Sequence, residues 1–535
     1  MFTTTSTSTI TKLPTMVYSF VLPTTSHLSF QKFISSSTHP SLPQAATTAR
    51  HALRIALKTH KRLPRGTQRD SHFPSIVNAA YAYIPYLQAI SNGLNGTPIQ
   101  PNNSSEVIEI TQHAEIECEW RATLTSVALM KISHPTASRV RIQGINSELA
   151  FVLTTLAYAL SGLASVTVNR TVYSTTTPSA EQRTTAIQES MKYLLQAASV
   201  HSLLGSSPAL VSVSRPILDL DPATQASLSS LALAEATLLA VFKDDCYITA
   251  CIQARNPNDK DWMVRAPEMP KVRAPLFARL CIRAAEYAEQ AGAGMCAAGA
   301  EGKFLVSEDL VNYTDKLRVV ARARACRFFG IDAELAGKIG EGISWLQAAR
   351  EWSGLTGIGW TRQYAQRMRV GKEGPGMLSK LKQGWMDRRE EMHPGSDKAE
   401  LSLGDSSGRD EEGRVIEMLE AKWTRMNDTV FSPSPSVEGD CNQQGEILMC
   451  SQINTQLVPP FNDLVSKLPS GRDIVSPPVP YQLSPLDEEE LAHMRAPPAE
   501  DEFKSSSDVD DSDDEPSAAR DTPGTVPSRS TSAYY

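Results

Sequence analysis

The sequence lacks the short motifs with which common enzymes bind phosphate, dinucleotides or zinc. None of GxxxxGK[ST], GxGxxG and HExxH occurs in the 535 residues, and GxSxG occurs once, at residues 404–408, within a stretch that has no strand-to-helix pattern. The ten histidines are dispersed, and none has a partner at the spacing of metal ligands. We therefore predict a noncatalytic protein with no cofactor and no metal. We expect His201 and Glu235, which interrupt apolar helical patterns, to be satisfied by structural hydrogen bonds.

Cysteine is scarce and its spacing indicates no site. The eight cysteines include no CxxC and no cluster with histidine, so the pattern predicts neither a zinc site nor a disulfide framework. Free thiols scattered over helical segments are typical of a protein in a reducing compartment.

Acidic residues are absent before Asp70, as they are from mitochondrial presequences. The basic residues before residue 50 are too far apart for an arginine-rich amphipathic helix, so import is an alternative hypothesis. Acid gathers instead near the C-terminus, where residues 487–515 carry a local charge of −11 within a net charge of −7. The remaining body is mildly basic, which suits an anionic membrane surface but does not indicate nucleic acid.

No charged residue lies between Glu148 and Arg170. Leucine and valine recur at steps of three and four over residues 147–167, which predicts a helix, and interspersed alanines let neighbours approach closely. About 20 apolar residues could also cross a bilayer, but Ser, Thr, Tyr and Gly interrupt this run. We favour a buried core helix over a membrane span.

Helical periodicity dominates the rest of the body. We predict a short strand at residues 18–22, a helix beginning near residue 44, and helices over residues 73–90, 107–130, 185–204, 223–244, 276–293, 310–329, 331–352 and 412–426. On the helix expected over residues 107–130, Glu115, Glu117 and Glu119 would form a solvated charge run.

Composition divides the chain into three parts. We expect a disordered N-terminus over residues 1–15, a helical domain over 16–435 and a disordered Pro-rich, acidic tail over 436–535. Residues 354–413 are a poorly patterned insertion in the domain. The fold class is mainly α, a solenoid-like array of antiparallel helices.

The helix that begins near residue 44 carries four basic residues on one face, Arg50, Arg54, Lys58 and Lys61. We interpret this face first as a solvated surface. The alternative is a surface for an acidic partner or for lipid headgroups.

Six short patterns occur in one order along the chain. They are Glu148, Leu149, Ala150, Val152 and Leu153; Met191, Lys192 and Tyr193 before Ala197, Ala198 and Leu204; Leu231 and Ala232 before Ala234 and Glu235; Arg279 and Leu280 before Ala284, Ala285, Glu286 and Tyr287; Gly340 and Glu341 with Ile343 and Leu346; and Asn427 and Asp428 before Val430 and Phe431. In this order they resemble the Bro domain of Alix-type ESCRT-associated proteins, over roughly residues 17–435. Residues 17–25 and 468–472 are similar to the single-domain fungal members that act in ambient-pH signalling.

The resemblance implies a curved, tetratricopeptide-like Bro-type helical array with a small N-terminal β element and no catalysis. It implies an adaptor of alkaline-pH signalling that is required for proteolytic activation of a PacC-type transcription factor. The implied partner is a Snf-type ESCRT-III subunit, whose amphipathic C-terminal helix Bro domains bind. The implied location is cytoplasmic, with peripheral recruitment to the plasma membrane or endosome. A general endosomal sorting scaffold and a mitochondrial helical protein are the alternatives.

The apolar docking patch of the family falls here on Leu238, Leu276 and Leu280. Leu276 and Leu280 are four residues apart on one helix face, a spacing that suits a groove for a partner helix. Ordinary core leucines would show the same spacing.

Two hypotheses concern the tail. Ser505, Ser507 and Ser512 each have an acidic residue three positions later, a pattern that acidophilic kinases favour, and each phosphate would add roughly −1.5 to −2 charges. The Pro-rich residues 477–485 suit a polyproline II ligand of an SH3-type groove. A plain disordered tail accounts for both patterns as well.

Overall fold

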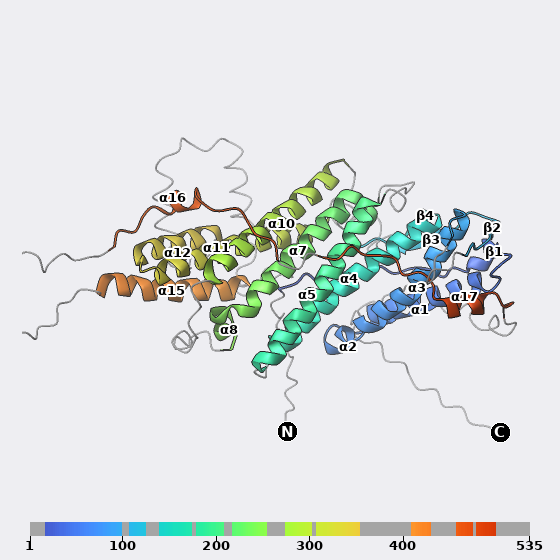
Figure 1. Cartoon of the computed structure of the whole chain (residues 1–535), viewed down its shortest axis with the longest axis horizontal. Coiled ribbons are helices and arrows are strands. Elements are labelled where there is room, and N and C mark those ends of the chain that lie inside the picture. The colour runs from blue at the N-terminus through green and yellow to red at the C-terminus, as the bar shows by residue number, and fades with distance from the viewer. Residues whose placement is uncertain are drawn as a thin grey trace, which may run out of the picture.

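The computed structural model describes residues 16–98, 106–124, 139–173, 178–207, 217–253, 273–301, 306–353, 408–429, 456–474 and 478–498. Its long helices pack side by side as an elongated array, in the order α1, α3, α4, α5, α7, α10, α11, α12 and α15 (Figure 1). In chain order they are α1 (Leu42–Arg62), α2 (Thr67–Asp70), α3 (Phe73–Leu94), α4 (Ile145–Thr171), α5 (Ala180–Ser206), α7 (Pro222–Asp244), α8 (Cys246–Gln253), α10 (Arg273–Glu301), α11 (Glu308–Leu335), α12 (Ile339–Ser353), α15 (Arg409–Thr429), α16 (Phe461–Val465) and α17 (Glu488–Met494). The predicted helical array with a small N-terminal β element is confirmed.

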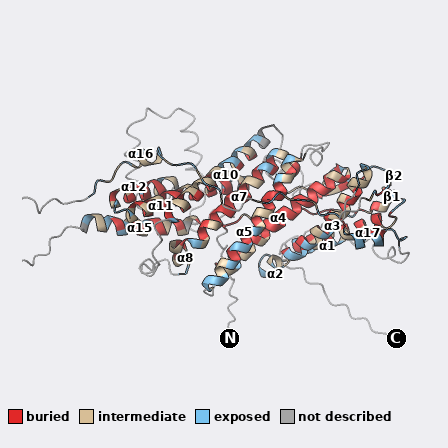
Figure 2. Cartoon of the chain, in the orientation of Figure 1, coloured by how far each residue is buried: buried red, intermediate tan, exposed pale blue. Residues whose placement is uncertain are grey.

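The charge-free stretch forms α4, a core helix. Two helices of the described residues, α4 and α7, are long and apolar enough to cross a membrane, but 89% and 78% of their most apolar windows are buried within the protein. Figure 2 shows α4 buried along most of its length. The prediction of a core helix is therefore confirmed, because the packing of α3, α5 and the N-terminal segment supplies the apolar surroundings that the sequence of α4 requires.

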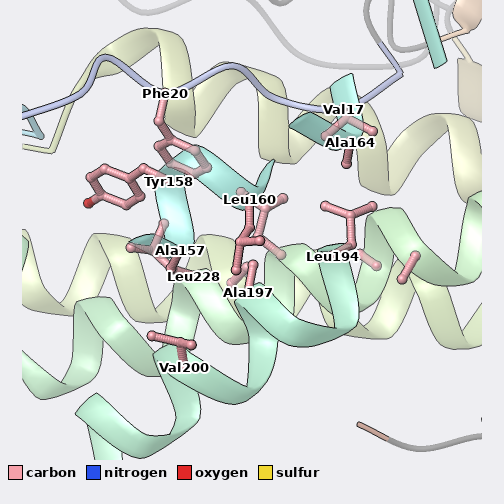
Figure 3. Close-up of a cluster of buried hydrophobic side chains, with 14 of the residues drawn as sticks. Val17, Phe20, Ala157, Tyr158, Leu160, Ala164, Leu194, Ala197, Val200 and Leu228 are labelled. Atoms are coloured by element: carbon pink, nitrogen blue, oxygen red, sulfur yellow. The ribbon is translucent and has the colours of Figure 1, made fainter. Parts of the chain in front are cut away.

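The N-terminal segment around residue 20 contributes to this core (Figure 3). Phe20 stacks on Tyr158 of α4 with ring centroids 4.5 Å apart, and Val17 is 1% exposed. Residues 18–22 form no strand, so that prediction was wrong. The backbone N–H of Tyr18 instead donates to the Glu235 carboxylate at 2.7 Å.

The expected helix at residues 107–130 is replaced by strands where the structure describes this region. β2 (Ile110–Gln112) pairs with β1 (Ile34–Ser36), and β3 (Glu117–Arg121) pairs with β4 (Arg139–Gln143), both antiparallel. The acidic residues alternate with buried Cys118 and Trp120 along β3. This two-residue alternation is the pattern of a half-buried strand, and it was the signal that sequence analysis misjudged.

The boundary between α11 and α12 also differs from prediction. We expected a break at Gly330, but the helix continues to Leu335, and the turn falls at Gly337, whose φ is +77°. Glycine adopts this left-handed conformation without the steric penalty that a side chain imposes. Gly330 lies inside α11, where an added Cβ would come within 3.1 Å of the Trp423 ring.

Oppositely charged side chains form buried ion pairs at two places in the described body. At the N-terminal end, Arg50 of α1 donates to Glu148 of α4 at 2.8 Å. Toward the other end, a second cluster joins α11, α15 and the residue after α7, and its members are Arg324, Arg327, Asp245 and Glu412. Removing one partner of such a pair would leave an uncompensated buried charge, which is strongly destabilising.

The chain after α15 returns along the body. We call residues 456–474 the first strap segment and residues 478–498 the second strap segment. Figure 1 shows them passing from the α12 and α15 end, across the middle, to the end that holds β1 and β2. The expectation that all of 436–535 is a disordered tail is therefore wrong for these two segments. Residues 1–15, expected to be disordered, lie outside the described residues, as do Ser505, Ser507 and Ser512. Of the expected insertion at 354–413, residues 354–407 also lie outside them, whereas the last residues belong to α15.

Candidate partner-binding face

One strip of α10 carries the residues on which sequence analysis placed a partner. Residues 276, 279, 280, 283, 286 and 287 are spaced by three, four and seven positions, so they share one side of the helix. We call them the α10 strip. α10 packs on α7 and α11, and every residue of the strip except buried Leu280 is partly exposed.

The three predicted docking leucines are not equally accessible. Leu238 of α7 is 3% exposed and Leu280 is 8% exposed, so both belong to the core. Only Leu276 is partly exposed. Partner binding through Leu238, Leu276 and Leu280 stays a prediction, and of the three side chains only Leu276 is accessible in this structure.

The first strap segment lies on the α10 strip and bonds to its backbone. The Arg472 N–H donates to the Arg279 carbonyl oxygen at 3.1 Å, although this carbonyl lies in the interior of the helix. In return the Arg279 side chain donates through Nε to the Ser470 carbonyl oxygen at 3.2 Å. The Gly471 N–H donates to the Glu286 carboxylate at 3.3 Å.

An ionic contact closes the strap over the strip. Asp473 accepts from Arg283 Nε and from the Tyr287 hydroxyl, both at 2.7 Å. The Arg283 guanidinium also lies 4.3 Å from the centroid of the Tyr287 ring. The hydrogen bond from Tyr287, followed by the bond from Arg283, lowers the pKa of Asp473 below its usual value. Burial, with the same hydrogen bond, raises the pKa of Tyr287.

A cavity of about 250 Å³ adjoins the strip. Its walls come from α10, α11, the end of α12 and the strap, with Ile282, Cys326, Trp352 and Leu468 among them. Arg322 stacks over Trp352 at 4.7 Å. Leu468 is thus the apolar side chain with which the strap covers the space between α10 and α11.

The predicted basic face of α1 is not continuous. Arg50 is 1% exposed and is paired with Glu148, so its place on an exposed surface was wrong. Arg54 and Lys58 are partly buried, and Lys61 is exposed. The reason is long-range, because the Glu148 partner is 98 residues away in the chain. A membrane or acidic-partner role for Arg54, Lys58 and Lys61 stays a prediction.

The buried polar side chains that sequence analysis singled out are structural. His201 is 1% exposed and its Nδ1 lies 2.6 Å from the Gln225 side-chain oxygen. Glu235 accepts the Tyr18 N–H and, at 2.7 Å, the Tyr313 hydroxyl. Burial raises the pKa of Glu235 to about 8 and lowers the pKa of His201 to about 4. In the described part of the chain, no three His, Cys, Asp or Glu side chains are placed to hold a metal ion.

The family is decided by a model of the BRO1-like domain, which matches residues 27–371. The chain belongs to the BRO1-like domain family. These are noncatalytic adaptors, in agreement with our prediction. The matched residues include α10 and its strip, whereas both strap segments follow the matched part.

A curated relative is similar over nearly the whole chain. The pH-response regulator protein palC of Emericella nidulans (strain FGSC A4) is 56% identical over 538 residues, covering 97% of this chain and all of the relative. Since the chain has 535 residues, this coverage necessarily extends over most of the strap.

Solved structures of BRO1 domains are similar at low identity. A complex of the ALIX BRO1 domain with CHMP4C is 15% identical, with a TM-score of 0.48, and covers 88% of this chain and 98% of that one. ALIX in complex with the SIVmac239 PYKEVTEDL late domain is 14% identical, also with a TM-score of 0.48, and covers 90% of this chain and 51% of that one.

Proposed function

We propose that this protein is a noncatalytic adaptor of ambient alkaline-pH signalling, required for proteolytic activation of a PacC-type transcription factor. The observation that carries the proposal is the 56% identity to a pH-response regulator over 97% of the chain. An identity this high over both full lengths concerns the whole molecule and not only a shared domain. A cytoplasmic location with recruitment to the plasma membrane or endosome belongs to the same proposal.

The partner that we propose is the amphipathic C-terminal helix of a Snf-type ESCRT-III subunit, and the site is the α10 strip. An amphipathic helix docks through apolar anchors at i, i+3 and i+4 flanked by polar groups. On the strip, partly exposed Leu276 lies near two basic residues, Arg279 and Arg283, and a cavity adjoins the strip. Buried Leu238 and Leu280 support this surface from below and do not contact the partner directly.

The alternative of a mitochondrial protein requires removal of an N-terminal presequence. Processing near residue 40 would delete Val17 and Phe20, which lie in the core against α4. It would also remove the backbone N–H of Tyr18 from buried Glu235. The adaptor proposal keeps these contacts intact, and we therefore prefer it.

The test is a titration of the full chain with a peptide of the C-terminal helix of the fungal Snf-type subunit. We expect saturable binding that Leu276→Asp weakens at least tenfold, since removal of an interface anchor typically costs about 2 kcal/mol. Leu203→Asp on α5 is the matched control, because Leu203 is also partly exposed but lies on another helix. Equal binding by both variants would contradict the site. Absence of binding by the folded wild-type chain would contradict the function.

A further inference from the structure

We propose that the first strap segment is an intramolecular occupant of the α10 strip, which an ESCRT-III helix has to displace before it binds there. The inference rests on the proposed function and concerns the regulation of the same site. It makes the strip a surface with two alternative occupants, one supplied by the chain itself.

The backbone contacts show that the strap and a partner helix cannot share the strip. The strap bonds directly to the Arg279 carbonyl and crosses α10 over Arg283. At Gly471 an added Cβ would lie 2.8 Å from both the backbone N and the Cα of Arg283, a distance shorter than any ordinary contact. No side chain of a partner fits between two backbones at this separation.

The occupant also uses the polar groups that a partner would need. Arg283 and Tyr287 both point at Asp473, and Glu286 accepts the Gly471 N–H. An acidic group on an incoming helix would therefore compete with Asp473 for Arg283. Leu468 lines the cavity beside the strip and occupies the place that an apolar anchor of the partner would take.

The contact between the first strap segment and the α10 strip is weak enough to open. None of the residues of the first strap segment is fully buried, and Ser470, Arg472 and Asp473 are exposed. The ion pair of Asp473 with Arg283 is accessible to solvent, and such pairs are weak. The second strap segment stays attached when the first leaves, because buried Leu486, Leu491 and Met494 hold it on the body.

Occupation by the strap lowers the apparent affinity for the partner. A ligand that binds only the open state loses affinity in proportion to the open fraction. If the strap covers the strip about 90 to 99% of the time, its release strengthens binding about 10- to 100-fold.

The substitution Gly471→Ala tests whether the first strap segment competes with the partner, and it leaves the sequence of α10 unchanged. Its φ does not require glycine, so the added Cβ acts only by its clash with Arg283. Val479→Ser is the matched control, because Val479 lies in the strap but is 81% exposed. Both full-length variants and the wild type are titrated with the Snf-type helix peptide, and limited proteolysis of the strap reports its release.

We expect Gly471→Ala to bind the peptide at least tenfold more tightly than the wild type, with Val479→Ser unchanged. Equal affinity of Gly471→Ala and the wild type, with proteolysis showing the strap released, would overturn the inference while the proposed function stands. Absence of binding by every form would overturn the proposed function, and the inference with it. Asp473→Ala is a second, weaker variant should Gly471→Ala fold poorly, with an expected two- to fivefold gain in peptide affinity.

Discussion

The two strap segments lie on the same body but are held by different forces. The first segment crosses α10 through hydrogen bonds and one exposed ion pair, and its apolar residues, such as Phe461, Leu464 and Leu468, pack against the body but are only partly buried. The second inserts Leu486, Leu491 and Met494, which are 1%, 1% and 4% exposed. Apolar burial contributes about 1.5–3 kcal/mol per large side chain, whereas exposed ion pairs contribute about 0–1 kcal/mol. The second segment is therefore an anchor and the first is a releasable cover.

The location of the anchor supports this difference. The Ser41 N–H donates to the Met494 carbonyl at 3.2 Å, which ties α17 to the start of α1. Arg495 pairs with Glu106 at 2.7 Å at the same end. These contacts lie at the β1 and β2 end of the array, far along the body from α10 (Figure 1). Loss of the first segment therefore leaves the anchor contacts in place.

The largest expected effect comes from breaking the anchor with Leu491→Asp. A buried, unpaired carboxylate is destabilising by about 3–5 kcal/mol, so the second segment should detach and its proteolysis should accelerate at least 100-fold. Ala492→Asp is the matched control, because Ala492 follows Leu491 directly in the chain but is exposed. Equal proteolysis of the two variants would show that the second segment is not anchored by Leu491.

A second test contrasts two carboxylates that each accept a tyrosine hydroxyl. The raised pKa of buried Glu235, about 8 against an ordinary 4.5, means that its stabilising contribution is complete below pH 4.5 and is lost as pH rises through 8. We expect the free energy of unfolding to fall by on the order of 3 kcal/mol between pH 5 and 8. The lowered pKa of Asp473 keeps it ionised over this range, so strap docking should stay constant.

Chemical denaturation at several pH values measures the first quantity and hydrogen exchange of the strap measures the second. Glu235→Gln cannot ionise, so its unfolding curve should depend less on pH. The same dependence in this variant would assign the pH effect to other groups.

The smallest effect concerns the ion pair on the strip. A double-mutant cycle with Arg283→Ala and Asp473→Ala should give a coupling free energy of about 0.5–1 kcal/mol, since both side chains are partly solvated. Strap release measured by hydrogen exchange would then change two- to fivefold. A coupling above about 3 kcal/mol would mean that the first segment is as firmly held as the anchor.

The helices whose apolar residues recur with a clear helical period were predicted from the sequence. The charge-free stretch at 147–167 became α4 (Ile145–Thr171), and the leucine pattern at 223–244 became α7 (Pro222–Asp244). The strand β3 was missed because Glu117 and Glu119 were assigned helical spacing when their alternation with Cys118 and Trp120 was the stronger signal.

Features that depend on distant residues could not be predicted. Arg50 looked like a surface residue because its partner Glu148 comes from another helix. Leu238 and Leu280 were assigned from the family resemblance, but only the folded structure shows that both are buried. The strap looked disordered because its composition is Pro-rich, and the few apolar residues that fix it, such as Leu486 and Leu491, are too sparse to form a periodic pattern.

The most direct test of the account is amide hydrogen exchange in the full chain, with and without saturating Snf-type helix peptide. The amides of Gly471 and Arg472 report the first strap segment, because each donates to α10. The amide of Leu491, bonded to the Asp487 carbonyl at 3.0 Å, reports the anchor. We predict that the peptide accelerates exchange at Gly471 and Arg472 at least tenfold and leaves Leu491 unchanged. Saturation by the peptide with all three amides unchanged would show that the partner binds elsewhere and would contradict the account.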